Sequence, residues 1–255
     1  SDFWKTSNEN KPFFSYYKLS DSHASVFKLT PTDAREQRSS LLEDEELHDP
    51  KDVPVPTFVP DTALFRERMA LFYDALSNVD KRVGTILNKL EELKLNENTI
   101  VVFTSDHGYH LGEHGHWQKQ TLFENSTRVP LIFVGPGVEN RKSKTNSPVE
   151  LLDIYPTLMD LTNIDVPDHV VGKTLTPLFK NKKQEVRSGA LTKWKNGYSL
   201  KTTNYRITQW GENGELGYEL YDHSADQNEL TNLASNSSYN HILDELTIVL
   251  NNRIK

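Results

Sequence analysis

The chain has 255 residues, a formal net charge of -7 at pH 7 and no cysteine. This length suits one large domain or two smaller ones, and 36% hydrophobic residues are enough to form a buried core. The acidic balance excludes a general nucleic-acid binder, which needs a basic surface. Without cysteine these residues can form no disulfide, thiolate metal site or cysteine nucleophile. Because no apolar run approaches the ~20 residues that cross a bilayer, we expect no membrane span.

A buried strand is the first element that the sequence predicts, at residues 11–19, where aromatic residues follow a proline. His23 comes in the loop just beyond it. A histidine in such a loop is commonly a surface or hydrogen-bonded structural residue, and a functional role is the alternative. Residues 30–60 are polar and contain several prolines, so we expect a loop. Its acidic run, residues 43–46, is expected to be solvated, with a calcium site as the alternative.

A long amphipathic helix is predicted from residue 61 to about residue 93, with Pro60 and Asp61 providing the stop and the cap before it. Its apolar residues recur at spacings of three, four and seven, which places them on one helical face. We interpret this face as core packing. A short loop then leads into the next strand, and the order helix, loop, strand is typical of an α/β fold. The apolar residues are Phe65, Met69, Phe72, Leu76, Val79, Val83, Ile86, Leu87 and Leu90.

The candidate site follows a strand predicted at residues 100–103, a β-branched and aromatic run without polar alternation. Such a run is typical of a strand buried on both faces of a parallel sheet. Asp106, His107 and Gly108 come directly after it, where ligands bind in open α/β sheets. The loop that follows is rich in titratable and aromatic side chains, namely His110, Glu113, His114, His116, Trp117 and Lys119.

The residues of this loop leave several roles open. The histidines at 110, 114 and 116 are expected to shape the loop or to contact substrate. The alternative is that they form a separate zinc site of their own. Glu113 and Trp117 are expected to shape the loop first and to face substrate second. An aspartate beside a histidine, as at residues 106 and 107, suggests zinc or manganese, because calcium prefers oxygen ligands.

Two more α/β elements are predicted after the loop. A buried strand is expected at residues 128–134, ended by the glycines and proline of residues 135–137. A helix is expected from about residue 148 to residue 161, with a kink or break at Pro156. Residues 172–178 are then expected to be extended.

Beyond residue 185 the periodicity becomes alternating, which predicts a small antiparallel sheet. An amphipathic helix at residues 242–254 is expected to close it. We interpret this region as a structural subdomain, with the alternative that Lys193 or Trp194 faces the substrate. The predicted strands are residues 189–194, 198–202, 205–210 and 218–221.

Several runs of sequence carry a resemblance to a known family. Residues 104–108, 117–124 and 128–132 closely resemble the type I sulfatases of the alkaline phosphatase superfamily, and look most like the iduronate-2-sulfatase type. The likeness runs over most of the chain, and the spacing from Asp106 to Lys119 is its most specific part. The other matching segments are residues 54–62, 153–158, 197–199, 205–206 and 219–222.

The resemblance implies an α/β fold, part of an alkaline-phosphatase-like doubly wound sheet with a small carboxyl-terminal antiparallel α+β subdomain. Residues 1–184 would form the carboxyl-terminal part of the sulfatase catalytic domain, and residues 185–255 the subdomain. Enzymes of this family tend to be exported or lysosomal, so the resemblance also implies a secreted, periplasmic or lysosomal location.

The resemblance further implies a chemistry. Sulfatases of this type hold a divalent cation, usually calcium, beside a formylglycine made from Cys or Ser; magnesium, manganese and zinc are the alternatives for the cation. By position, Asp106 and His107 resemble metal ligands of the family, and Lys119 resembles a residue that contacts a sulfate oxygen. His23 falls where the family has a histidine that contacts sulfate and protonates the leaving oxygen. The residues predicted to bind substrate are His116, Trp117 and Lys193.

Other parts of the family's site are missing from these residues. The chain has no Cys, no Ser in the family's Cys/Ser-x-Pro-Ser-Arg context, and no amino-terminal Asp-Asp metal pair. We therefore expect the carboxyl-terminal part of a sulfatase that acts on a sulfated saccharide such as a glycosaminoglycan, with the missing amino-terminal half of the enzyme as its partner. Alone, the chain is expected to be inactive and to expose strand edges that the missing strands would cover. The alternatives are a metal-dependent phosphatase or phosphodiesterase of the same superfamily, and a non-catalytic remnant or subunit.

Overall fold

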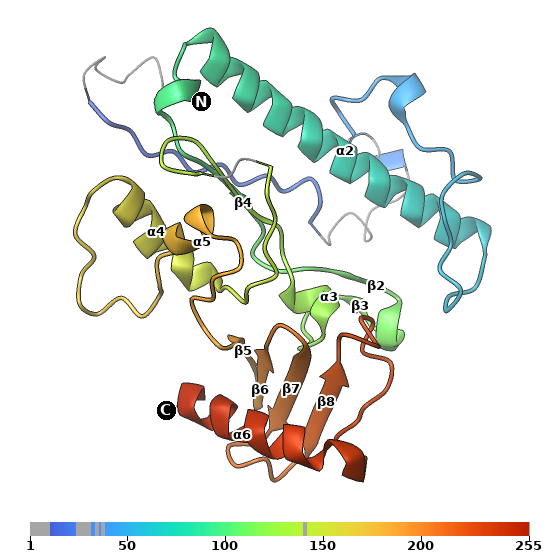
Figure 1. Cartoon of the computed structure of the whole chain (residues 1–255). Coiled ribbons are helices and arrows are strands. Elements are labelled where there is room, and N and C mark those ends of the chain that lie inside the picture. The colour runs from blue at the N-terminus through green and yellow to red at the C-terminus, as the bar shows by residue number, and fades with distance from the viewer. Residues whose placement is uncertain (1–10, 24–31, 34–35, 37–38, 140–141, 255) are drawn as a thin grey trace. The chain divides into compact units, whose positions relative to one another are not determined.

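The computed structural model divides into two compact units, Ser1–Glu92 (unit 1) and Leu93–Lys255 (unit 2), each considered by itself (Figure 1). The domain boundary expected near residue 184 stays a prediction. None of the helices in the described part of the chain is long and apolar enough to cross a membrane. The residues that the structure describes are 11–23, 32–33, 36, 39–139 and 142–254.

Unit 1 is built on helix α2 (Ala63–Glu92), which confirms the long helix predicted from the apolar spacing. The residue that caps the helix lies one position later than expected. Thr62 Oγ1 accepts a hydrogen bond from the Phe65 amide (3.2 Å), while Asp61 instead forms an ion pair with Arg66 (2.6 Å). Thr62 is therefore the residue that satisfies a free amide of the first turn.

Two buried polar residues of α2 hold the preceding loop. The Leu41 amide donates to Asn78 Oδ1 (2.9 Å), and the His48 amide donates to Asp74 Oδ1 (2.8 Å). The acidic run is exposed to solvent as expected, but it forms a short 3-10 helix, η3 (Asp44–Glu46), and not a loop, and its last residue pairs with Lys81 of α2. Polar side chains of α2 therefore hold the loop that precedes the helix.

The strand predicted at residues 11–19 is wrong, because the structure gives these residues no regular secondary structure. Phe14 and Tyr16 are 82% and 79% exposed, so the apolar run is not buried. An extended segment becomes a strand only when a neighbouring strand pairs with its backbone groups, and no described residue pairs with it in this way.

Unit 2 begins, after the short turn η4 (Asn96–Asn98), with strand β1 (Val101–Thr104), which pairs with β4 (Leu131–Val134). The two strands were predicted, but the expected parallel pairing and full burial are wrong for them. The connection brings the chain back to the carboxyl-terminal end of β1, so that Leu131 pairs with Thr104. The two strands therefore run antiparallel, with Val101 opposite Val134. Ile132 and Val134 on one face of β4 are 50% and 56% exposed.

The connection between β1 and β4 contains four short elements that the sequence pattern did not predict. Strand β2 (His110–Leu111) pairs with β3 (Trp117–Gln118) around the turn η5 (Glu113–Gly115). A single helical turn, α3 (Glu124–Thr127), follows before β4. This connection carries most of the predicted site residues.

The next region forms the turn η6 (Leu151–Asp153), helix α4 (Ile154–Leu161) and helix α5 (Thr176–Lys180). The break expected at Pro156 falls earlier, between η6 and α4. Proline is tolerated there because it lies in the first turn of α4, where its missing amide has no helical partner to lose. The extended segment expected to reach residue 178 is wrong at its end, since α5 begins at Thr176 with a proline in its first turn.

The carboxyl-terminal part confirms the predicted antiparallel sheet and closing helix. Its strands are β5 (Ala190–Trp194), β6 (Gly197–Lys201), β7 (Tyr205–Trp210) and β8 (Tyr218–Asp222), paired in that order. After the turn η7 (Ser237–Tyr239), helix α6 (Asn240–Ile254) lies across one face of the sheet (Figure 1). The core between them consists of Leu200, Ile207, Leu220, Leu246 and Leu250.

The side chains that alternate with this core are buried and polar. Ser199, Arg206 and Thr208 are each at most 1% exposed, although neighbouring residues of the same strands face α6. Successive residues of a strand point to opposite faces, so these polar groups lie on the face away from α6. That face contacts the connection between β1 and β4 and so reaches the candidate site.

Candidate active site

Asp106, His107 and Lys119 lie together just beyond strand β1. Asp106 Oδ2 is 3.7 Å from His107 Nε2, and Lys119 Nζ is 2.7 Å from the same nitrogen. The structure thus brings together a carboxylate, an imidazole and an ammonium group that the sequence separates by up to 13 positions. Their predicted roles in catalysis and metal binding stay predictions.

The hydrogen bonds of His107 decide which ring nitrogen carries its proton. Nδ1 lies 2.7 Å from the Gly108 carbonyl oxygen, which can only accept, so Nδ1 carries the hydrogen. In the neutral ring, Nε2 therefore presents its lone pair, to which the Lys119 ammonium donates. An imidazole fixed in this tautomer presents the nitrogen that a metal would need.

The donor atoms of this site fit part of a metal site. The Asp106 side chain is 86% exposed and that of His107 is 30% exposed, so their facing atoms are accessible from solvent. Two donor atoms are fewer than the four ligands of zinc or the six or more of calcium. A cation held here needs further ligands from outside the pair, and it must replace Lys119 as the partner of Nε2.

A close backbone approach fixes the loop at Gly108. Its amide donates to the Ser126 carbonyl oxygen of α3 (2.8 Å), and a Cβ at Gly108 would lie 2.0 Å from the Asn125 carbonyl oxygen. Only glycine lets the chain pass so near to α3. On the other side of the site, Gln118 and Gln120 have positive φ angles of 72° and 82°, so Lys119 lies between two residues in a backbone conformation that is uncommon outside glycine.

The three histidines beyond His107 pack around Phe123. The His110 side chain is fully buried, with Nε2 2.7 Å from Thr121 Oγ1, and the His114 ring stacks on Phe123 with centroids 3.9 Å apart. Burial lowers the pKa of His110, and the Glu113 carboxylate only partly opposes this shift. Among the described residues these histidine rings form no converged ligand set, so the zinc alternative is not supported. Their expected roles in shaping the loop or contacting substrate stay predictions.

One other group of described residues does bring three possible metal ligands together: Glu124, His223 and Glu229. The buried guanidinium of Arg206 already neutralises it, pairing with Glu229 (2.5 Å) and with Glu124. A second cation would be repelled, so this group is an ion-pair network and not a metal site. The sequence pattern did not indicate it, although a charged Arg206 inside a predicted strand was an available signal.

The predicted substrate-binding residues occupy two places in unit 2. His116 and Trp117 are exposed neighbours near the start of β3, and Trp117 is 46% exposed. Lys193 lies on β5, where its Nζ is 4.9 Å from the Tyr198 ring centroid on the paired strand. His23 is an exposed residue of unit 1, and the role predicted for it stays a prediction.

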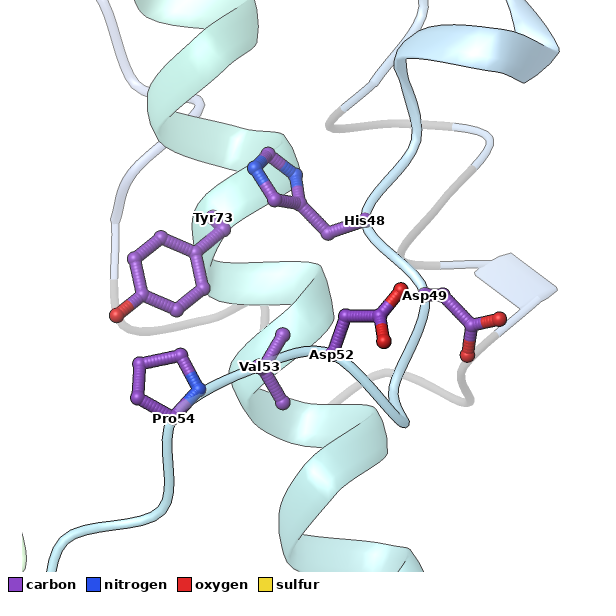
Figure 2. Close-up of a pocket in the computed structure, with 6 residues that line it drawn as sticks. All are labelled: His48, Asp49, Asp52, Val53, Pro54 and Tyr73. Atoms are coloured by element: carbon purple, nitrogen blue, oxygen red, sulfur yellow. The ribbon is translucent and has the colours of Figure 1, made fainter.

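Unit 1 also has a cavity of about 260 Å³, shown in Figure 2. His48 faces it from the loop, with Nδ1 2.9 Å from Asp74 Oδ1, and Tyr73 faces it from α2. None of the predicted site residues lines it, so the cavity adds nothing to the site at His107. Its lining residues are His48, Asp49, Asp52, Val53, Pro54 and Tyr73.

Family matches cover nearly the whole chain. Residues 2–164 match the sulfatase family, and residues 112–255 match the carboxyl-terminal family of N-sulphoglucosamine sulphohydrolase. The chain belongs to the sulfatase family. The α/β sulfatase fold expected from the sequence is thereby confirmed, together with its carboxyl-terminal antiparallel sheet.

Two curated relatives illustrate how much of a sulfatase this chain represents. It is 35% identical over 176 residues to a sulfatase of Formosa agariphila, covering 69% of this chain and 34% of that protein. It is 32% identical over 182 residues to arylsulfatase K of Gallus gallus, covering 66% of this chain and 34% of that protein. The chain spans about a third of the length of these relatives.

Solved structures give the same picture. One, in complex with its substrate D-glucosamine-2-N,6-O-disulfate, has a TM-score of 0.69 at 27% identity, over 74% of this chain and 41% of that one. A 2-O glycosaminoglycan sulfatase has a TM-score of 0.67 at 29% identity, over 76% and 44% of the two chains. A phosphonate monoester hydrolase of Agrobacterium radiobacter has a TM-score of 0.66 at 25% identity, over 75% and 43%.

Proposed function

We propose that this chain is the carboxyl-terminal part of a sulfatase that cleaves sulfate from a sulfated saccharide. The observation that carries the proposal is the convergence of Asp106 and Lys119 on His107 Nε2, at 3.7 and 2.7 Å. A carboxylate and an imidazole can hold a cation, and that cation together with a nearby ammonium group can bind an anionic substrate. Membership of the sulfatase family supports the choice of a sulfate ester.

In the proposed site, Asp106 and His107 would hold a divalent cation. We favour calcium on the family resemblance, with magnesium, manganese and zinc as alternatives. When bound, the cation neutralises sulfate oxygens and so favours attack at sulfur. The Gly108 carbonyl keeps the proton on His107 Nδ1, which leaves Nε2 ready to act as a ligand.

Lys119 and His23 would act on the substrate itself. With an anion bound, the Lys119 ammonium turns from His107 to a sulfate oxygen and donates a charge-assisted hydrogen bond. That bond strengthens as negative charge develops, which lowers the barrier. The imidazolium of His23 would give its proton to the leaving alcohol oxygen.

The nucleophile of the proposed enzyme lies outside this chain. No Cys is present, and no Ser stands in the Cys/Ser-x-Pro-Ser-Arg context from which formylglycine is made. The matched segment covers only about a third of the first relatives, which supports an amino-terminal half that supplies the nucleophile and the remaining ligands. We therefore propose that the isolated chain is inactive.

For the substrate we propose a sulfated saccharide of the glycosaminoglycan type. The exposed Trp117 offers a flat apolar face to a sugar ring beside His116, and Lys193 offers a charge to a second anionic group. One similar structure holds a disulfated glucosamine and another is a 2-O glycosaminoglycan sulfatase, which supports this class. The iduronate-2-sulfatase type and an exported or lysosomal location belong to the same proposal.

A phosphonate or phosphate ester hydrolase is the second candidate. It rests on the likeness to the phosphonate monoester hydrolase, whose fold is shared at 25% identity. The two candidates differ in the charge of the ester that the site must stabilise, so matched sulfate and phosphate esters of one alcohol separate them.

The test joins this chain to an upstream segment that carries Cys-x-Pro-Ser-Arg and measures release of 4-methylumbelliferone from its sulfate and phosphate esters. We expect turnover of the sulfate only by the joined protein. Lys119→Met should lower kcat/KM by roughly 100- to 1,000-fold, because it removes one stabilising charge from the transition state.

Lys183→Met, at an exposed position away from the site, is the matched control and should keep full activity. Turnover by the isolated chain would contradict the missing-half proposal. Preference for the phosphate ester would select the second candidate, and no loss in Lys119→Met would remove Lys119 from the site.

A further inference from the structure

Arg206 of strand β7 connects the carboxyl-terminal sheet to helix α3. Its side chain is 2% exposed and pairs with the Glu124 carboxylate at the first residue of α3. One of its nitrogens also donates to Thr127 Oγ1, at the last residue of the same helix (3.0 Å). Both ends of a single helical turn are therefore tied to one buried guanidinium.

Glu229 completes this attachment from a loop after β8. Its Oε2 accepts the amide of Glu124 (2.7 Å), and its Oε1 accepts from Arg206 Nε (2.5 Å). A carboxylate at this amide satisfies a free donor of the first turn. Burial by itself would raise the pKa of Glu229, but the His223 hydrogen bond and the Arg206 charge outweigh it and hold the pKa below its ordinary value.

Helix α3 in turn touches the residue next to His107. The Gly108 amide donates to the Ser126 carbonyl oxygen (2.8 Å), and the backbone of α3 leaves no room for a Cβ at Gly108. The Gly108 carbonyl is the acceptor that fixes the His107 tautomer. A continuous line of contacts thus runs from Arg206 and Glu229 through α3 and Gly108 to His107.

The Lys119 side of the site rests on the same sheet. Leu122, three residues after Lys119, is 3% exposed. A Cβ at Gly197 of β6 would lie 2.6 Å from its side chain, so Leu122 is seated directly on that strand. Both partners of the His107 and Lys119 contact are therefore anchored to the sheet.

We propose that Arg206 and Glu229 are positioning residues, which seat α3 against Gly108 and thereby hold His107 in the tautomer that faces Lys119 and Asp106. Neither residue touches the site itself. Their contribution is to keep the Gly108 backbone in place, since a helix of one turn has too few internal hydrogen bonds to hold its own position. The inference rests on the proposed function only for its effect on catalysis.

The test uses two readouts of the 255-residue chain that need no activity. Hydrogen exchange of the Gly108 amide reports whether α3 is seated, and the 15N correlation pattern of the His107 ring, assigned with His107→Gln, reports its tautomer. We expect Glu229→Gln and Arg206→Lys to speed Gly108 exchange by roughly tenfold or more. Both should also lose the pure Nδ1–H pattern of His107.

Thr127→Val is the milder variant if either charge change prevents folding. It removes one acceptor of Arg206 and leaves both ion pairs in place, so we expect a smaller change of the same kind. Thr247→Val is its matched control, because Thr247 likewise donates to the carbonyl four residues earlier in a helix but contacts no residue of α3. It should leave both readouts unchanged.

Arg187→Lys controls for loss of stability. Arg187 is also a buried guanidinium between two carboxylates, Glu150 and Asp153, in the same unit. A purely structural role predicts that Arg187→Lys and Arg206→Lys, matched for lost stability, change His107 equally. That result, or an unchanged Gly108 and His107 in folded Thr127→Val, Glu229→Gln and Arg206→Lys, would overturn the proposal.

In the joined enzyme the same variants should lower kcat more than they change KM.

Discussion

Individual side chains of the site are tuned by neighbours that lie from one to 12 residues away in the sequence. His107 owes its tautomer to a carbonyl one residue on and its Nε2 partner to a lysine 12 residues on. His110, three residues later, is fully buried and bonded to Thr121. Two imidazoles of one loop therefore differ in their surroundings. That of His107 is partly exposed to solvent, and that of His110 is packed inside the protein.

Burial of His110 should make stability depend on pH. Burial lowers the pKa of folded His110 below the ~6.5 of an unfolded chain, so the unfolded chain binds more protons as the pH falls. The contribution of neutral His110 is complete above about pH 6.5 and is lost as the pH falls through the folded pKa.

We expect wild-type unfolding free energy to fall more steeply between pH 7 and 5 than that of His110→Gln, by at most about 1.4 kcal/mol per pH unit. Urea unfolding at a series of pH values measures the difference. His169→Gln, at an exposed position, is the control and should follow the wild type. Parallel curves for wild type and His110→Gln would contradict the role of burial.

At the scale of elements, helix α3 depends wholly on its surroundings. Four residues form its single turn, which is far below the roughly 12 residues at which an isolated helix becomes marginally stable. Contacts with Gly108, Arg206 and Glu229 supply what the helix lacks. Elements such as α3 are invisible to a periodicity argument, because they have too few residues to show a period.

Gly108→Ala should test the contact between α3 and the site. The new Cβ would lie 2.0 Å from the Asn125 carbonyl oxygen, so α3 must move. We expect a loss of about 2–3 kcal/mol of stability, together with weaker protection of the Ser126 region in hydrogen exchange.

Gly84→Ala is the matched control for this substitution. A Cβ there meets nothing within 4 Å in the middle of helix α2, so the change should stabilise the chain by about 0.5–1 kcal/mol. Chemical denaturation compares the two variants. If neither variant changes the stability, α3 must accommodate the methyl group without cost.

At the scale of unit 2 as a whole, one carboxylate joins three segments. Glu150, just before η6, accepts from the Leu191 amide of β5 (2.8 Å) and pairs with Arg187 (2.6 Å) and Arg253 of α6 (2.7 Å). Its side chain is 9% exposed, so these bonds are largely shielded from water. Breaking such a pair from one side leaves a buried charge without its partner.

Glu150→Gln should therefore cost about 2–4 kcal/mol of unfolding free energy, because Asp153 still neutralises Arg187 but the uncharged amide cannot neutralise Arg253. Thermal and urea unfolding measure the loss. Glu92→Gln, which breaks an exposed pair with Lys89, is the control and should cost less than about 0.5 kcal/mol. Similar losses in the two variants would show that Glu150 is not the joint of this unit.

Features that depend on neighbours along the chain were predictable without coordinates. The apolar period of α2, the alternation of β5–β8 and the closing α6 were all predictable, because each repeats over enough residues to define one face. The position of Asp106 and His107 beyond a strand was predictable for the same reason. The sulfatase likeness came from these same local runs.

Contacts between segments that are distant in the sequence were visible in the three-dimensional structure alone. The antiparallel pairing of β1 with β4, the seat of α3 on Gly108 and the pairing of Arg206 with Glu124, 82 residues away, have no signature in a local pattern. Residues 11–19 had the composition of a strand, but no described strand pairs with them, so they form none. Local composition sets what a segment can become, and the free energy of contacts between distant segments decides what it does become.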